Sequence, residues 1–125
     1  MNCKTTILHL ILLLSVLLGQ FPVELSPEEM TEAQSFTADT DTEFLLTITA
    51  STNTNWSLAD SESATLVVAI DDEWTNYNQD IVLYAGQEQH DYHISLGPIS
   101  TGEHNIQFLF DSKKSSTGAT LIEIE

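Results

Sequence analysis

The chain has 125 residues, enough for one domain, and a formal net charge of −16. All nineteen acidic residues lie at or after Glu24, and only Lys113 and Lys114 oppose them there, which leaves a net charge of −17 for that part. Such a surface repels phosphates and anionic headgroups, which excludes nucleic acid and anionic membranes as partners. It attracts cations or a basic partner, or it serves only to keep the protein soluble.

The first 25 residues predict an export signal. A single lysine precedes the almost wholly apolar run 7–18. This run has the length of a signal-peptide core and is shorter than the ~20 apolar residues that a membrane span needs. We expect residues 1–25 to be a signal peptide, cleaved after Gly19 or near Ser26, or a retained signal anchor. The protein is then secreted or held at the cell surface, with no other membrane binding.

The expected mature domain contains no cysteine, because the only one, Cys3, lies in the leader. Small exported domains often depend on disulfides. A domain of about 100 residues can instead be stabilised by its apolar core. Residues 26–34 are acidic and polar, which is typical of a linker, and residues 35–125 are expected to form the domain.

Within residues 35–125, apolar and polar side chains alternate with the period of two that marks half-buried strands. Phe44, Leu46 and Ile48 share one face of such a strand, whereas 64–70 is apolar on both faces, as in a central strand. The expected strands, in chain order, are 35–37, 43–50, 64–70, 80–84, 90–96, 103–110 and 119–124. Short strands separated by turn residues, with no amphipathic helix, predict an all-β, antiparallel immunoglobulin-like β-sandwich of about seven strands.

The run LGPISTGEHNIQFLFD, residues 96–111, carries a resemblance to a known group of domains. Gly97-Pro98 is expected to end one strand, and His104 leads an apolar row on the next. The pattern resembles the corner of bacterial immunoglobulin-like or fibronectin type III-like modules. There a tyrosine at the start of the penultimate strand bonds back to the preceding corner, and His104 stands in its place. The paired cysteines of true immunoglobulin domains are missing, and the resemblance implies no functional residue.

The same run contains Ser100, His104 and Asp111, the residue types of a hydrolase triad. Asp111 lies roughly 23 Å from His104 along an extended strand, too far to orient it. No G-x-S-x-G turn surrounds Ser100. We therefore expect no enzymatic activity, and a small secreted hydrolase is the least favoured alternative.

The sequence contains two sets of candidate metal ligands. His90 and His93 are three apart on an expected strand, which sends their side chains to opposite faces and disfavours zinc. Carboxylates can gather in the loops at one end of a sandwich and hold calcium there, as hard cations prefer oxygen ligands. The alternative is a solvated turn, and no other cofactor is expected. The proposed calcium ligands are Asp71, Asp72, Glu73 and Asp80.

The loop 74–79 combines aromatic and amide side chains, a mixture that suits sugar recognition. Aromatic rings stack on the apolar faces of sugars, and amides bond their hydroxyl groups. The alternative is that Trp74 or Trp56 folds inward and fills the core. The proposed ligand-binding residues are Trp74, Asn76, Tyr77, Asn78 and Gln79.

These features together predict a non-catalytic, exported module for binding or adhesion, whose ligand is an extracellular carbohydrate or protein. A second class of function remains open, in which the domain is a structural spacer or accessory domain of a larger secreted protein and has no ligand of its own.

Overall fold

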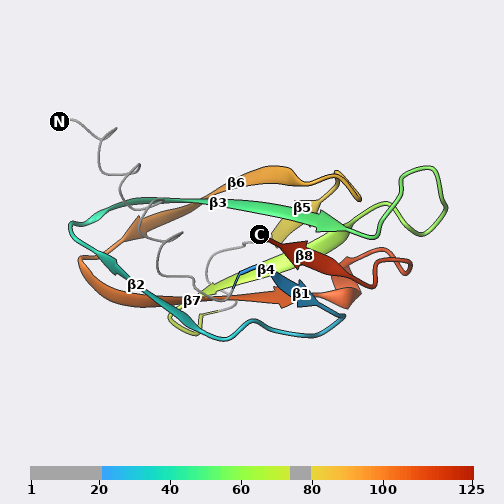
Figure 1. Cartoon of the computed structure of the whole chain (residues 1–125). Coiled ribbons are helices and arrows are strands. Elements are labelled where there is room, and N and C mark those ends of the chain that lie inside the picture. Colours follow the sequence, from blue (N-terminus) through green and yellow to red (C-terminus); the bar gives the residue numbers. More distant parts are fainter. Residues whose placement is uncertain (1–20, 74–79) are drawn as a thin grey trace.

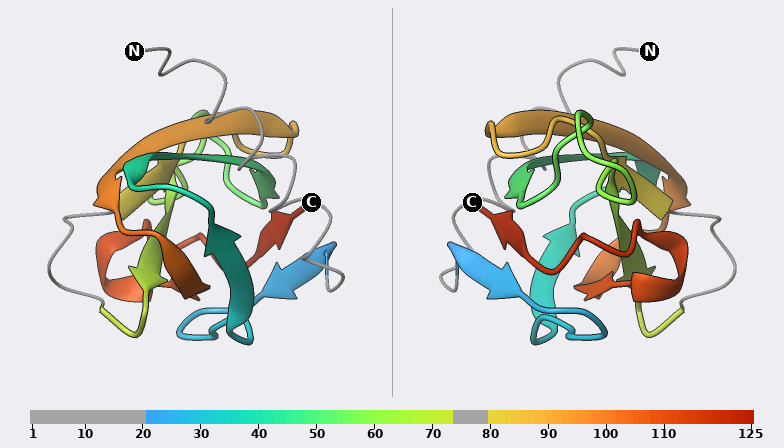
Figure 2. Two further views of the ribbon diagram at one scale, coloured as in Figure 1. Left: turned by 90° about the vertical axis from the view of Figure 1, so that its left-hand side faces the viewer. Right: turned by 90° about the vertical axis from the view of Figure 1, so that its right-hand side faces the viewer.

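The computed structural model describes residues 21–73 and 80–125 (Figure 1). These residues form two antiparallel, four-stranded sheets and the segments that connect their strands. One sheet has the strand order β1-β8-β3-β6 and the other β2-β7-β4-β5, and Figure 2 shows them as two layers. Within these residues there is no α-helix, and no helix long and apolar enough to cross a membrane. The elements are β1 (Val23–Leu25), β2 (Gln34–Ala38), β3 (Thr42–Thr52), β4 (Ala64–Ile70), β5 (Asp80–Leu83), β6 (His90–Ile99), β7 (Gly102–Phe110), the 3-10 turn η1 (Ser112–Lys114) and β8 (Ile122–Ile124).

The core lies between the two sheets and is built from every second residue of the strands. In β3 the predicted row is buried, and all seven residues of β4 are buried, as expected of a central strand. Phe36 of β2 stacks on Phe44 of β3 with ring centroids 5.1 Å apart, and this contact joins the two sheets. The prediction of an all-β, two-sheet fold is therefore confirmed.

Strand β6 continues through Gly97 and Pro98, where the sequence predicts its end, so that prediction was wrong. Because β6 is the last strand of its sheet, proline at this position need not break a ladder between two neighbours. The pairing register shifts between Phe44 and Leu45 of β3, which produces a bulge, and Gly97 there adopts a φ of 79°. The strand can therefore turn without ending, and it reaches Ile99.

The acidic segment 26–34 lies along β7. The backbone N–H groups of Glu28 and Thr31 donate to the carbonyls of Phe110 and Phe108, each at 2.9 Å, and Met30 forms a bridge with Leu109. Backbone pairing does not depend on side-chain pattern, so composition alone gave no signal for it.

Strand β1 falls within the segment that the sequence assigns to the export signal. Its Leu25 is 2% exposed and belongs to the core, and the ring of Phe21 meets that of Phe108 edge-on at 6.5 Å. Cleavage after Gly19 would keep these contacts, whereas cleavage near Ser26 would remove them.

We expect a chain that starts at Ser26 to be less stable than one that starts at Gln20. Loss of the buried Leu25 side chain and of the β1–β8 pairing should lower the free energy of unfolding by about 2–4 kcal/mol. Urea denaturation of the two purified chains measures the difference. Glu24→Ala, which changes an exposed residue of the same strand, should have little effect. Equal stability of the two chains would show that β1 does not contribute to the fold.

Candidate functional site

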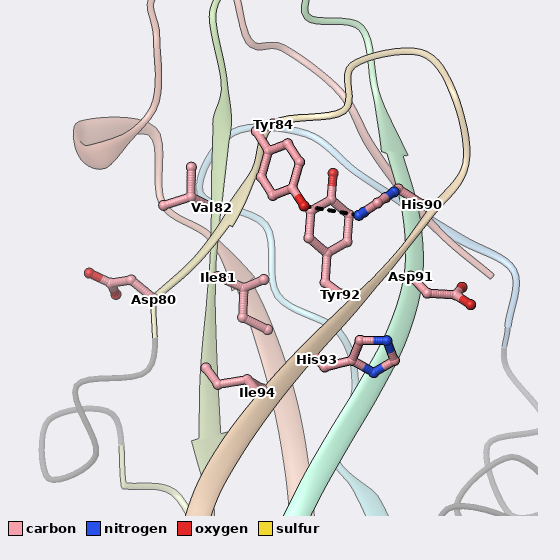
Figure 3. Close-up of a pocket in the computed structure, with 9 residues that line it drawn as sticks. All are labelled: Asp80, Ile81, Val82, Tyr84, His90, Asp91, Tyr92, His93 and Ile94. Carbon is pink, nitrogen blue, oxygen red and sulfur yellow. Dashed lines mark hydrogen bonds between the residues drawn. The ribbon is translucent and has the colours of Figure 1, made fainter.

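An open groove of about 610 Å³ lies between β5 and β6 (Figure 3). Each of these strands is the last of its sheet, so each presents an unpaired edge to the groove. β5 contributes Asp80, Ile81 and Val82, and β6 contributes Tyr92 and Ile94. The groove is therefore built from the open side of the sandwich.

The floor of the groove is apolar and fixed in position. Ile81 and Tyr92 are each 6% exposed and belong to the core, and Ile94 packs against it. The hydroxyl of Tyr92 accepts a hydrogen bond from the backbone N–H of Ala85 at 3.0 Å. Burial raises the pKa of Tyr92, which keeps this phenol neutral.

Three aromatic rings meet at one end of the groove. The ring centroid of Tyr84 lies 5.3 Å from that of His90 and 5.4 Å from that of Tyr92, and His90 and Tyr92 are 4.8 Å apart. A hydrogen bond of 3.0 Å joins the Tyr84 hydroxyl to His90 Nε2 (Figure 3). Tyr84 is 51% exposed, so the cluster offers an accessible aromatic surface that its neighbours hold in place.

Trp56 extends this aromatic surface. Its indole N–H donates to the backbone carbonyl of Tyr84 at 2.7 Å, and its side chain is 63% exposed. The alternative in which Trp56 fills the core is therefore wrong. An indole N–H needs a partner, and here it finds one at the surface and leaves the ring open to solvent.

The turn that follows Tyr84 and leads into β6 is held against the end of β3. Thr52 N–H donates to the carbonyl of Gly86 at 2.8 Å. Gly86 has a φ of 69°, and a Cβ there would lie 2.8 Å from the carbonyl oxygen of Thr54, so only glycine fits. This close approach fixes the position of the aromatic end of the groove.

The predicted sugar-binding residues Trp74, Asn76, Tyr77, Asn78 and Gln79 lie outside the described residues, so their role stays a prediction. In the sequence they directly precede Asp80, whose carboxylate accepts hydrogen bonds of 3.0 and 2.9 Å from Lys114 Nζ.

The predicted calcium ligands do not form a metal centre in the part of the chain that the structure describes. No group of three or more histidine, cysteine or acidic side chains in residues 21–73 and 80–125 could hold a metal ion. Asp71 and Asp72 form a tight turn, with φ angles of 52° and 65°, that Glu73 closes by donating to Ile70. Asp80 is paired with Lys114. Calcium binding stays a prediction.

His104 joins two turns at one end of the sandwich. Its Nε2 lies 2.7 Å from the carbonyl oxygen of Ser100, as the corner pattern predicts. Its Nδ1 lies 2.7 Å from Oδ2 of Asp71, whose other oxygen accepts from Asn105 N–H at 2.9 Å. Because both partners of the ring are acceptors, the protonated ring, in which both nitrogens donate, satisfies both contacts at once.

The charges of this pair support each other. Burial alone would lower the pKa of His104, but the hydrogen bonds to Asp71 and Ser100, with the charge of Asp71, raise it overall. Burial alone would raise the pKa of Asp71, but the hydrogen bonds from His104 and Asn105 and the charge of His104 lower it. The two groups are therefore charged together over a wider pH range than either would be alone.

We expect His104→Gln to destabilise the protein by about 1 kcal/mol, because the Asp71 partner is half exposed and screened by water. The stabilisation that His104 contributes to the folded state is complete below its ordinary pKa of 6.5 and is lost as pH rises through the raised pKa of the folded state. The stabilisation that Asp71 contributes is present above its ordinary pKa of 3.8 and is lost as pH falls through its lowered pKa. The difference in the free energy of unfolding between the wild type and His104→Gln should therefore be largest between about pH 4 and pH 6.5.

Denaturation of the wild type and the variant across this range measures the effect. His93→Gln is a matched control, since His93 is exposed and its ring is hydrogen-bonded to the hydroxyl of Thr47. If the difference in the free energy of unfolding between the wild type and His104→Gln does not vary with pH, His104 and Asp71 do not form a charged pair.

The remaining predictions concern the histidines of β6 and the residue types of a hydrolase triad. His90 and His93 lie on opposite faces of β6, as predicted. Ser100 reaches His104 through its carbonyl and not its hydroxyl, and Asp111 caps the 3-10 turn.

Sequence reasoning missed the cluster of Trp56, Tyr84, His90 and Tyr92. The offset of two between His90 and Tyr92 places both on one strand face, but nothing in the sequence indicates that Trp56 and Tyr84 join them.

In comparisons with known proteins, no family model matches the chain, and the search of curated proteins finds no match.

Proposed function

We propose that the protein is a non-catalytic, exported module that binds a carbohydrate in the groove between β5 and β6. The observation that carries the proposal is the half-exposed ring of Tyr84 at the end of a groove with an apolar floor, with the exposed side chain of Trp56 hydrogen-bonded beside it. Flat rings stack on the apolar faces of sugars, and the polar groups beside them can bond the hydroxyls. Because Tyr84 and Tyr92 are already held in place, a sugar would bind without ordering them first.

A protein ligand is the second candidate. β5 and β6 are both free edges, and an extended peptide can add to such an edge through backbone hydrogen bonds. The exposed rings favour the sugar, because strand addition draws on the backbone and needs no aromatic platform.

We also propose that the sandwich is immunoglobulin-like. Three pairings support this: β3 with β6, β4 with β7, and β5 on the outer side of β4 correspond to the B–E, C–F and C–C′ neighbours of that fold. The outer strands depart from it. β2 stands beside β7, where the last strand would lie, and β8 stands beside β3, where the first would lie. The resemblance therefore rests on the five central strands.

We expect Tyr84→Ala and Trp56→Ala each to weaken binding of an oligosaccharide by at least about tenfold, because each removes a stacking surface. A broad glycan array identifies the oligosaccharide, and titration calorimetry measures its affinity. Trp74→Ala tests the adjoining loop in the same way.

Met30→Ala is the matched control. Met30 is 55% exposed but pairs with β7 on the far side of the sheet from β5, so its loss should leave binding unchanged. If no glycan binds, or if the two aromatic variants bind as the wild type does, the proposal fails.

A further inference from the structure

We propose that the sugar bound in this groove is an amino sugar, a chain of glucosamine type whose protonated amine contacts Asp80. The inference rests on the proposed function and names the chemistry of its ligand. Three features of the described residues point to it: the sign of the surface charge, the ammonium group that Asp80 already holds, and the exposed ring of Tyr84 at the other end of the same groove.

The charge of the protein selects among classes of sugar. The nineteen acidic residues and two lysines at or beyond Glu24 give this part a net charge of −17. A field of that sign repels sulfated sugars and uronic acids, leaves neutral sugars unaffected, and concentrates cationic ones near the surface. The effect acts on all cations alike, so the position of the ligand depends on local contacts.

Asp80 supplies the local contact. It stands at the start of β5 on the wall of the groove. Lys114 Nζ donates to both of its carboxylate oxygens, at 3.0 and 2.9 Å, and this hydrogen bonding raises the pKa of the lysine. The site is thus already shaped to receive an ammonium group. Both side chains are exposed to solvent, so a ligand amine can share or replace this weak ion pair.

The aromatic end of the groove favours the same ligand. The faces of Tyr84 and Trp56 carry negative charge density, which attracts cations as well as the apolar faces of sugars. Val82, between Asp80 and Tyr84 on β5, is 50% exposed. Strand β5 and the residue after it therefore carry a carboxylate, an apolar side chain and an aromatic ring in succession; in Figure 3 the ring of Tyr84 points toward His90, and the carboxylate of Asp80 points away from it.

The test compares three tetrasaccharides by titration calorimetry at mildly acidic pH, where sugar amines are protonated: glucosamine, N-acetylglucosamine and galacturonate. We expect the glucosamine chain to bind at least about tenfold more tightly than its acetylated counterpart, and the galacturonate chain not to bind. The preference should shrink in 1 M salt, where the Debye length falls to about 3 Å.

Two variants with opposite expected effects test the contact with Asp80. Asp80→Asn should weaken binding of the glucosamine chain several-fold and leave the acetylated chain unchanged. Lys114→Gln frees the carboxylate and should strengthen binding of the glucosamine chain several-fold. Glu103→Gln removes the same unit of charge from β7, away from the groove, and should change neither.

The outcomes separate the two proposals. Equal binding of the amino and acetylated chains, or a preference that neither Asp80→Asn nor Lys114→Gln alters, would overturn the amino-sugar inference and leave the carbohydrate module standing. Absence of binding by every sugar would overturn the proposed function itself. If a lysine tetrapeptide binds as tightly as the glucosamine chain, with the same loss in Tyr84→Ala, the groove selects cationic chains in general, and the amino-sugar inference is overturned.

Discussion

The fold depends on the apolar layer between the two sheets, to which strands of both sheets contribute alternate residues. With no cysteine at or beyond Glu24 to cross-link the chain, burial must offset both the conformational entropy of folding and the mutual repulsion of nineteen carboxylates. The Phe36–Phe44 stack is the clearest single contact across this layer. Outside β4, whose residues are all buried, the layer takes about every second side chain and leaves the others for the surface.

The groove exists because β5 and β6, which are consecutive in the chain, lie at the edges of different sheets. Strands β5 and β6 are joined by a short turn but belong to different sheets, so the chain crosses from one layer to the other there. Among residues 21–73 and 80–125, neither strand has a paired neighbour on its outer side. The turn is anchored by Gly86 against the end of β3, and the rings of Tyr84, His90 and Tyr92 close this end of the opening. A rigid scaffold thereby holds in place the exposed aromatic residues that follow its strands.

Alternation along the chain predicted the two-sheet fold, and the continuous apolar run of β4 predicted a central strand, because each depends on a local pattern. The corner bond of His104 was predicted from the resemblance to immunoglobulin-like corners. Features that depend on distant residues could not be predicted in this way. The sequence names Asp71 as a metal ligand, yet in the fold it meets His104 from another strand. Trp56 lies far along the chain from Tyr84, and only the folded structure shows that they meet. Gly97-Pro98 reads as a strand end unless the edge position of β6 is known.

The pairing of β1 with β8 has a mechanical consequence. Val23 lies opposite Ile124 and Leu25 opposite Ile122, so the chain enters and leaves this sheet at the same point. The ladder bonds of antiparallel strands run perpendicular to the strands. Tension applied through these two positions would pull along those bonds and open them one after another, as in unzipping, instead of shearing them together. A module suspended by both flanks would yield at low force from this pair of strands, while the groove on the opposite edge kept its shape.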